Sequence, residues 1–129
     1  MKPGLDCGLQ AEVSFEVTEE MCPAFEGRVV HRVCATWTLV HYMEVAGRKI
    51  LIDYLESDEE GVGSYVSCDH TGPAAVGRQV QVVATVASVD RRELVCDTAA
   101  YCRGRPIATG RTVQRVFPQA VLARILQEG

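Results

Sequence analysis

Hydrophobic and polar residues alternate near the start of the chain. Between Leu9 and Val17 every second residue is apolar and those between them are polar, the apolar set being Ala11, Val13, Phe15 and Val17. A period of two places one face of a strand on a core, so the pattern predicts a strand over Leu9–Val17. Residues 19–34 lose this regularity and contain Pro23 and Gly27. They predict a loop or lid with a short helical turn.

The segment from Thr36 to Glu56 has the composition of a long helix. It is rich in Leu, Met, Ala and Glu, it lacks proline, and only Gly47 weakens it. Apolar residues occupy nearly every side of its first three turns, which predicts a buried helix rather than one lying on the surface. The charged run from Ser57 to Gly61 is expected to end it in a turn.

Further strands are predicted over the second half of the chain. β-branched alternation and turn sequences at Asp90–Arg92 and Arg103–Pro106 divide it into strands over Gly63–His70, Gln79–Val89, Glu93–Tyr101 and Ile107–Phe117, before a short amphipathic helix over Gln119–Gln127. The order predicts an α+β fold in which a curved antiparallel sheet wraps a long central helix. No repeat or linker divides residues 1–129, so one domain is expected. Open sheet edges favour a symmetric dimer.

Composition narrows the possible partners and the compartment. The 129 residues carry a formal net charge of −4 with scattered Lys and Arg, which argues against nucleic-acid binding and leaves room for a small anionic ligand. The longest apolar run is interrupted by charged residues and is not expected to span a membrane. The six cysteines form no Cys-x-x-Cys pair and no signal peptide precedes them, so reduced thiols in a cytoplasmic protein are expected.

One carboxylate stands out as candidate chemistry. Glu44 lies in the otherwise apolar stretch from Trp37 to Ile52, and a lone histidine, His70, follows downstream. An ionised carboxylate removed from water costs several kcal/mol unless it is paired, so its presence there favours a function. The alternatives are that Glu44 faces solvent or pairs with His41, one helical turn earlier, and that His70 is only a turn histidine.

Several short motifs in a fixed order resemble one enzyme family. They are Ala35-Thr36, Met43-Glu44-x-Ala46, Asp53-Tyr54-Leu55-Glu56, Gly61-Val62-Gly63, Cys68-Asp69-His70-Thr71, Gly110-x-Thr112 and Arg115. Their combined spacing, with eight residues from Thr36 to Glu44 and twenty-six from Glu44 to His70, resembles that of hot-dog-fold thioesterases of the fluoroacetyl-CoA thioesterase type. The likeness covers about residues 5 to 117.

The resemblance implies a hot-dog fold, a homodimer with acyl-CoA sites between subunits, and hydrolysis by Thr36, Glu44 and His70. By the same match Gly63 lies beside the acyl carbonyl and Arg115 on the substrate side. No metal or prosthetic group is implied, coenzyme A being part of the substrate. Two lid phenylalanines of the fluoroacetyl-specific enzyme fall on Gly27 and Val30, with only Phe25 nearby, so a different short or branched acyl group is predicted.

The sequence leaves the exact chemical role of several of these residues open. His70 suits a general base, and Glu44 suits either a nucleophile that forms an acyl anhydride or a base for water. Thr36 suits either a hydrogen-bonding partner of these groups or a helix N-cap, and Gly63 either a strand kink or a close backbone approach to ligand. Arg28, Arg32 and Arg48 could bind CoA phosphates, although scattered arginines are usually solvated.

One geometric condition limits the site. Eight residues along a straight helix rise about 12 Å, so Thr36 meets Glu44 only if the chain before the helix folds back or a second subunit completes the site. The alternatives to hydrolysis are an enoyl-CoA hydratase on the same fold, a non-catalytic acyl-CoA binding module, and a ligand-binding sheet protein unrelated to CoA.

Overall fold

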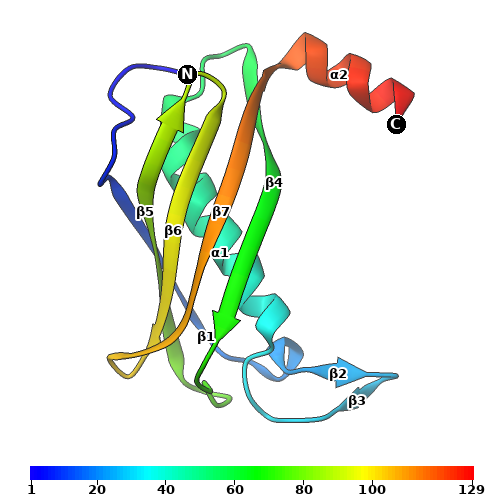
Figure 1. Cartoon of the computed structure of the whole chain (residues 1–129). Helices are drawn as coiled ribbons and strands as arrows, with labels where there is room; N and C mark the ends of the chain where they lie inside the picture. The colour runs from blue at the N-terminus through cyan, green and yellow to red at the C-terminus, as the bar shows by residue number, and fades with distance from the viewer.

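The computed structural model describes all residues from Met1 to Gly129. The helices are α1 (Thr36–Leu51) and α2 (Gln119–Glu128), with short 3-10 turns η1 (Glu19–Met21) and η2 (Ile52–Tyr54). The long strands are β1 (Gln10–Glu16), β4 (Glu59–His70), β5 (Gln79–Asp90), β6 (Glu93–Cys102) and β7 (Arg105–Pro118), and β2 (Ala24–Phe25) and β3 (Arg28–Val29) form a small hairpin. Figure 1 shows α1 lying along one face of the large sheet.

The large sheet is antiparallel throughout and has the order β1-β5-β6-β7-β4. Its register shifts at three places, between Gly63 and Tyr65, between Val86 and Ser88, and between Ala100 and Tyr101. Such bulges bend strands and increase their twist, which curves the sheet around α1. The predicted hot-dog architecture, an α+β fold with a central helix and a curved antiparallel sheet, is confirmed. β1 and β4 are its two open edges.

The core lies between α1 and the sheet. Leu39, Met43 and Leu51 of the helix are fully buried against inward residues of the strands such as Val82 and Leu94. Burying each of these large side chains stabilises the fold by roughly 1.5–3 kcal/mol. The prediction that α1 is buried on nearly every side is wrong, because the sheet covers only one side of it. Trp37 on the other side is 49% exposed.

Most element boundaries agree with the sequence within two residues, and two differ more. α1 ends at Leu51 instead of Glu56, because the chain tightens into η2 and is extended at Leu55. β4 begins at Glu59 instead of Gly63, because Glu59 and Glu60 pair with Pro118 and Phe117 of β7. The Glu59 side chain also accepts a hydrogen bond of 3.0 Å from the N-terminal amine. Residues 19–34 contain the expected helical turn, η1, followed by the β2 and β3 hairpin.

All six cysteines are free thiols, as predicted. Four are buried, whereas Cys7 is exposed. Burial is the main cause that raises the pKa of Cys34 to about 12, and it also raises the pKa of Cys68. These two thiols therefore stay protonated at neutral pH. Neither helix combines the length and apolar character needed to cross a membrane.

Replacement of Gly110 by alanine is expected to destabilise the fold. A Cβ at Gly110 would overlap the carbonyl oxygen of Ser67 on β4 and lie 3.2 Å from Thr98 Oγ1. The obstacle is backbone, so the strands must move apart, and overpacking of this kind costs about 1–3 kcal/mol or more. Urea unfolding measures the loss. Thr109→Ala, at the exposed neighbouring position of β7, is the control, and equal stability of the two variants would contradict the close approach.

Candidate functional site

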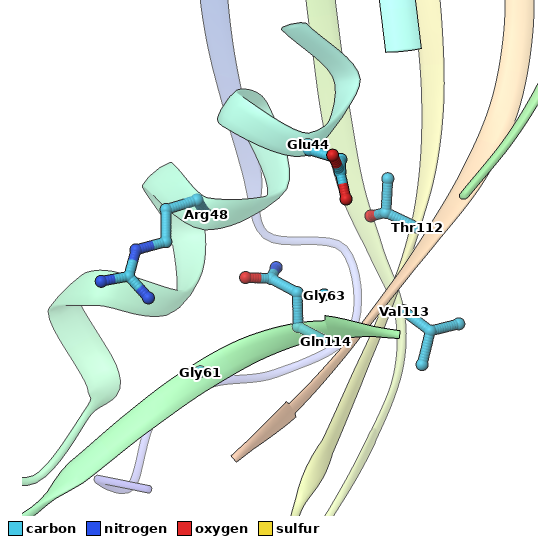
Figure 2. A pocket seen from close by; sticks show the side chains of 7 residues that line it. All are labelled: Glu44, Arg48, Gly61, Gly63, Thr112, Val113 and Gln114. Carbon is cyan, nitrogen blue, oxygen red and sulfur yellow. The ribbon is translucent and has the colours of Figure 1, made fainter. Parts of the chain in front are cut away.

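Glu44 lines a small cavity between α1 and the strands β4 and β7. The cavity has a volume of about 200 Å³, and only Val113 among its seven lining residues is hydrophobic. Figure 2 shows Glu44 and Gln114 pointing into the same space, with Arg48 directed away from them. The space exists partly because Gly61 and Gly63 have no side chains: a Cβ on Gly63 would lie 2.9 Å from Glu44 Oε1. Glu44 and Gly63 therefore meet.

Glu44 is exposed in the single chain, which corrects the expectation of a charge buried in an apolar helix. It lies at the border between α1 and the sheet, beside the edge strand β4. No hydrogen bond joins it to His41, whose ring lies against Tyr42 with ring centroids 5.0 Å apart. Of the alternatives left open by the sequence, solvent exposure is correct for one copy of the chain, and the local pair with His41 does not form.

Gly63 lies at a strand kink, which was one of its two predicted possibilities, and its approach to a ligand stays a prediction. The register of β4 against β7 shifts between Gly63 and Tyr65, so the glycine lies at a bulge that bends the strand. Its Cα also borders the cavity, where the Glu44 carboxylate leaves no room for a side chain. A ligand next to Glu44 would thus contact backbone of β4.

Two buried polar side chains on β7 form the floor of this cavity and were not predicted. Thr112 is 2% exposed and Gln114 is 8% exposed, and neither Thr112 Oγ1 nor Gln114 Nε2 has a hydrogen-bond partner. Buried polar atoms without partners are rare and cost about 1–3 kcal/mol each, so they are available to a water or a polar group that enters. Their signal in the sequence is a polar residue at two successive inward positions of an alternating strand.

Arg48 is neutralised by a carboxylate at the edge of the cavity. Its guanidinium lies 2.6 Å from Glu60 Oε2. The hydrogen bond from Arg48, with a second from the Gly61 backbone N–H, lowers the pKa of Glu60. The pair keeps Arg48 turned toward β4, so it is not a free cation for a phosphate in this conformation.

Thr36 and His70 form a second cluster, at the amino end of α1. Thr36 Oγ1 lies 2.9 Å from His70 Nδ1. Ala35, not Thr36, is the N-cap residue of α1, and no side chain caps the helix. The N-cap interpretation of Thr36 is therefore wrong, and its hydroxyl is free to hold the imidazole. Because Nδ1 is engaged, Nε2 of His70 is the nitrogen left for a substrate.

The two clusters are separate within one copy of the chain. Thr36 is the first residue of the continuous helix that carries Glu44. The rise between them is about 12 Å, and the chain does not fold back to shorten it. The structure thus brings Glu44 to Gly63 and Thr36 to His70, but it does not join the two pairs.

Arg115 lies outside both clusters. It follows Gln114 on β7, so its side chain projects from the opposite face of the sheet, where it is exposed and its Nε lies 3.4 Å from Glu93 Oε2. The structure does not bring this predicted substrate residue to the cavity of Glu44. Its role stays a prediction.

The lid consists of the β2 and β3 hairpin beside the start of α1. Phe25 is 60% exposed and meets Trp37 edge to face, with ring centroids 5.7 Å apart. Gly27, at one of the positions expected to match a family phenylalanine, has a φ of 77° in the hairpin turn. Val30, at the other, is exposed. The aromatic contact of the lid therefore comes from Phe25 and Trp37, next to Thr36.

The arrangement supplies the groups that acyl transfer to water requires. A carboxylate and an imidazole provide a base or nucleophile and a proton donor, and buried donors beside the carboxylate can hold water or a carbonyl oxygen. No cluster of three or more His, Cys, Asp or Glu side chains has the geometry of a metal site.

Comparisons with known proteins agree with this chemistry. Residues 17–120 match the model of the family described as fluoroacetyl-CoA-specific thioesterase, FlK. A hypothetical protein of Thermus thermophilus described as a thioesterase superfamily member is 37% identical, with a TM-score of 0.94 over 98% of this chain and 93% of that chain. A single-residue mutant of FlK is 25% identical, with a TM-score of 0.87 over 99% and 100%.

A hot-dog-like protein from Thermanaerovibrio acidaminovorans, 20% identical, has a TM-score of 0.87 over 98% of this chain and 92% of that chain, and shows the fold alone. No curated protein sequence matches the chain significantly.

The fold and these similarities define a hot-dog thioesterase, a hydrolase of thioesters. Within that class the chain belongs to the fluoroacetyl-CoA-specific thioesterase family, whose model it matches over most of its length. The family resemblance predicted from the motifs is confirmed.

Proposed function

We propose that this protein hydrolyses the thioester of a short acyl-CoA to the free acid and CoA, with Glu44, His70 and Thr36 as the reacting and orienting groups. The observation that supports it best is the cavity beside Glu44 and Gly63, together with membership of a thioesterase family. Solved structures of FlK variants hold fluoroacetate with CoA, or acetyl-CoA, which supports an acyl-CoA as the substrate class.

In the proposed reaction, water adds to the thioester carbonyl and CoA leaves as the thiol. Glu44 acts on the carbonyl side, either by removing a proton from water or by attacking the carbonyl itself. His70 supplies a proton to the leaving sulfur through Nε2 while Thr36 holds Nδ1. These side chains carry the chemistry, and CoA enters only as part of the substrate.

The proposed site needs two copies of the chain, because Glu44 and His70 of one copy are far apart. β4 is an open edge of the sheet, and it exposes Tyr65 by 54% and Val62 by 36%. An exposed edge with apolar residues is a ready surface for strand pairing. We expect a homodimer in which two β4 strands pair antiparallel about a two-fold axis perpendicular to the sheet, which leaves both α1 helices on the same face.

The pairing also accounts for the two separate clusters. If Gly63 of one β4 lies opposite His70 of the other, Glu44 of the first copy comes near the Thr36 and His70 pair of the second copy. Each dimer then contains two equal sites, and Trp37 and the uncovered side of α1 lie at the interface. Free thiols are typical of a reducing compartment, so we expect the dimer in the cytoplasm.

The proposal is tested with a panel of short, branched and aromatic acyl-CoAs, followed by release of free thiol. The expected result is turnover of short or branched acyl groups without a marked preference for fluoroacetyl-CoA, because Gly27 and Val30 replace the expected lid phenylalanines. Binding without thiol release would support a sequestering module instead. Addition of water to an enoyl-CoA without thiol release would support a hydratase, and no binding would refute the CoA assignment.

A further inference from the structure

A cleft distinct from the Glu44 cavity opens where three segments meet at the His70 end of the sheet. It has a volume of about 550 Å³ and lies between the connection from β4 to β5, the turn between β6 and β7, and Val33. Figure 1 shows the start of β5 and the turn between β6 and β7 at the same end of the sheet. The volume is in the range of about 300–1,000 Å³ that is usual for small-molecule sites.

Three arginines surround this cleft, and none of them has a carboxylate partner. Arg78 comes from the connection before β5, Arg103 comes from the turn between β6 and β7, and Arg105 is the first residue of β7. The ion pairs of the protein involve other arginines, namely Arg32, Arg48, Arg111 and Arg115. In a chain with a formal net charge of −4, a local group of three unpaired guanidinium groups is a positively charged site that an anion would neutralise.

The backbone of Arg103 is unusual for its residue type. Its φ is 55°, and that of the following Gly104 is 74°. Two successive positive φ values define a tight hairpin turn in which Asn, Asp or Gly is preferred at the first position. An arginine at this position costs conformational energy and does not help to form the turn. We therefore infer that Arg103 is present because of its side chain, which lines the cleft.

The cleft begins at the residues that directly follow the candidate catalytic histidine. Thr71 and Gly72 line it and directly follow His70 in the chain. Their backbone N–H groups donate to the carbonyl oxygen of Ile107, at 2.8 and 3.1 Å, which fixes this segment against β7. A ligand whose charged end fills the cleft can therefore extend toward His70 with its other end. Pro73, Pro106 and Ile107 add apolar walls that suit a flat ring.

We propose that this cleft binds the head group of CoA, with Arg78, Arg103 and Arg105 on its phosphates and the adenine ring against the apolar walls. The inference rests on the proposed function for the identity of the ligand, because a long thioester arm must link the phosphates to the reacting carbonyl. The guanidinium fork matches phosphate oxygens in two parallel hydrogen bonds. None of the three arginines touches the reacting carbonyl, so they bind substrate without acting in the chemistry.

The test compares two thioesters with the same acyl group, one on CoA and one on pantetheine, which lacks the nucleotide and its phosphates. The variant carries Arg78→Gln, Arg103→Asn and Arg105→Gln together, the asparagine preserving the turn. We expect kcat/KM for the acyl-CoA to fall by at least about tenfold through KM, and kcat/KM for the acyl-pantetheine to stay unchanged. The matched control removes three charges elsewhere, with Arg91→Gln, Arg92→Gln and Arg124→Gln, and should change neither value.

The proposal is overturned if the ratio of the two kcat/KM values is unchanged in the triple variant, whether neither value falls or both fall by the same factor. If the parent protein hydrolyses neither thioester, the proposed function is refuted. The CoA site can then still be tested by measuring CoA binding with calorimetry. Binding of CoA by the parent and by the control, and its loss in the triple variant, would then support the cleft. Equal affinity of the parent for ATP or inorganic phosphate would show a general anion site and refute the assignment to CoA.

Discussion

Glu44→Gln is expected to lower kcat for a good acyl-CoA substrate by about 10²–10⁴-fold with little change in stability. The amide keeps the shape of the side chain beside Gly63 but can neither accept the proton of water nor attack a carbonyl. Because Glu44 is exposed in the single chain, its replacement leaves the core intact. Thiol release measures the rate, and urea unfolding should give a free energy within about 0.5 kcal/mol of the parent.

A matched control separates this effect from a general change in charge. Glu16→Gln removes a carboxylate from an exposed position of β1, away from the cavity, and should leave kcat unchanged. A Glu44→Gln variant that retains its rate within a few-fold would refute the role of Glu44. A variant that loses its rate together with its cooperative unfolding would show a structural role instead.

The same residue allows the two chemical routes to be distinguished. In the anhydride route the carboxylate oxygen of Glu44 bonds to the acyl carbon, and water then cleaves the anhydride. In ¹⁸O-labelled water, label enters the Glu44 side chain each time that water attacks the Glu44 carbonyl carbon of the anhydride rather than the acyl carbon. In the general-base route, all of the label enters the acid product and none enters the protein.

Much of the fold could be predicted from local sequence patterns, because strand alternation and helix propensity depend on residues that are close together in the chain. The alternation of apolar and polar residues over β1 and β5 indicates a strand with one buried face, and the composition of α1 indicates high helix propensity. The ends of α1 and β4 were less certain, because the last turn of a helix and the pairing of Glu59 and Glu60 depend on contacts with distant residues. The pattern also could not show which side of α1 the sheet would leave open.

The candidate site was predictable only in part for a similar reason. Motif spacing identified Thr36 and His70, which the structure joins, and Glu44 and Gly63, which it also joins. It did not identify Gln114 on the cavity floor, because the motif spacing gave no role to the two inward polar residues of β7, and only the fold shows that they border a cavity.

The arginine cleft depends on contacts that the sequence did not show. Arg78 and Arg103 are 25 residues apart in the chain, and only the folded sheet places them around one space. Their spacing carries no local pattern that could have predicted the cleft.

Mixing two inactive variants is expected to restore activity if each site uses both copies of the chain. Glu44→Gln and His70→Ala each damage one half of every site in their own homodimers. A mixed dimer contains one site with both changes and one site with neither. Random assembly makes about half of the dimers mixed, and half of their sites are intact, so about one quarter of the parental rate should return.

The residue pairs within one cluster provide the control for this experiment. Thr36 and His70 belong to the same half of a site, so in mixed dimers of Thr36→Ala and His70→Ala both sites keep one change and no recovery is expected. The variants are coexpressed with different tags and mixed dimers are isolated. Their thiol release, expected at about half of the parental rate because one of two sites is intact, is compared with that of each homodimer. Mixed dimers of Glu44→Gln and His70→Ala without recovery would mean that Glu44 and His70 do not meet across the interface. A chain that stays monomeric by native mass spectrometry would refute the shared site altogether.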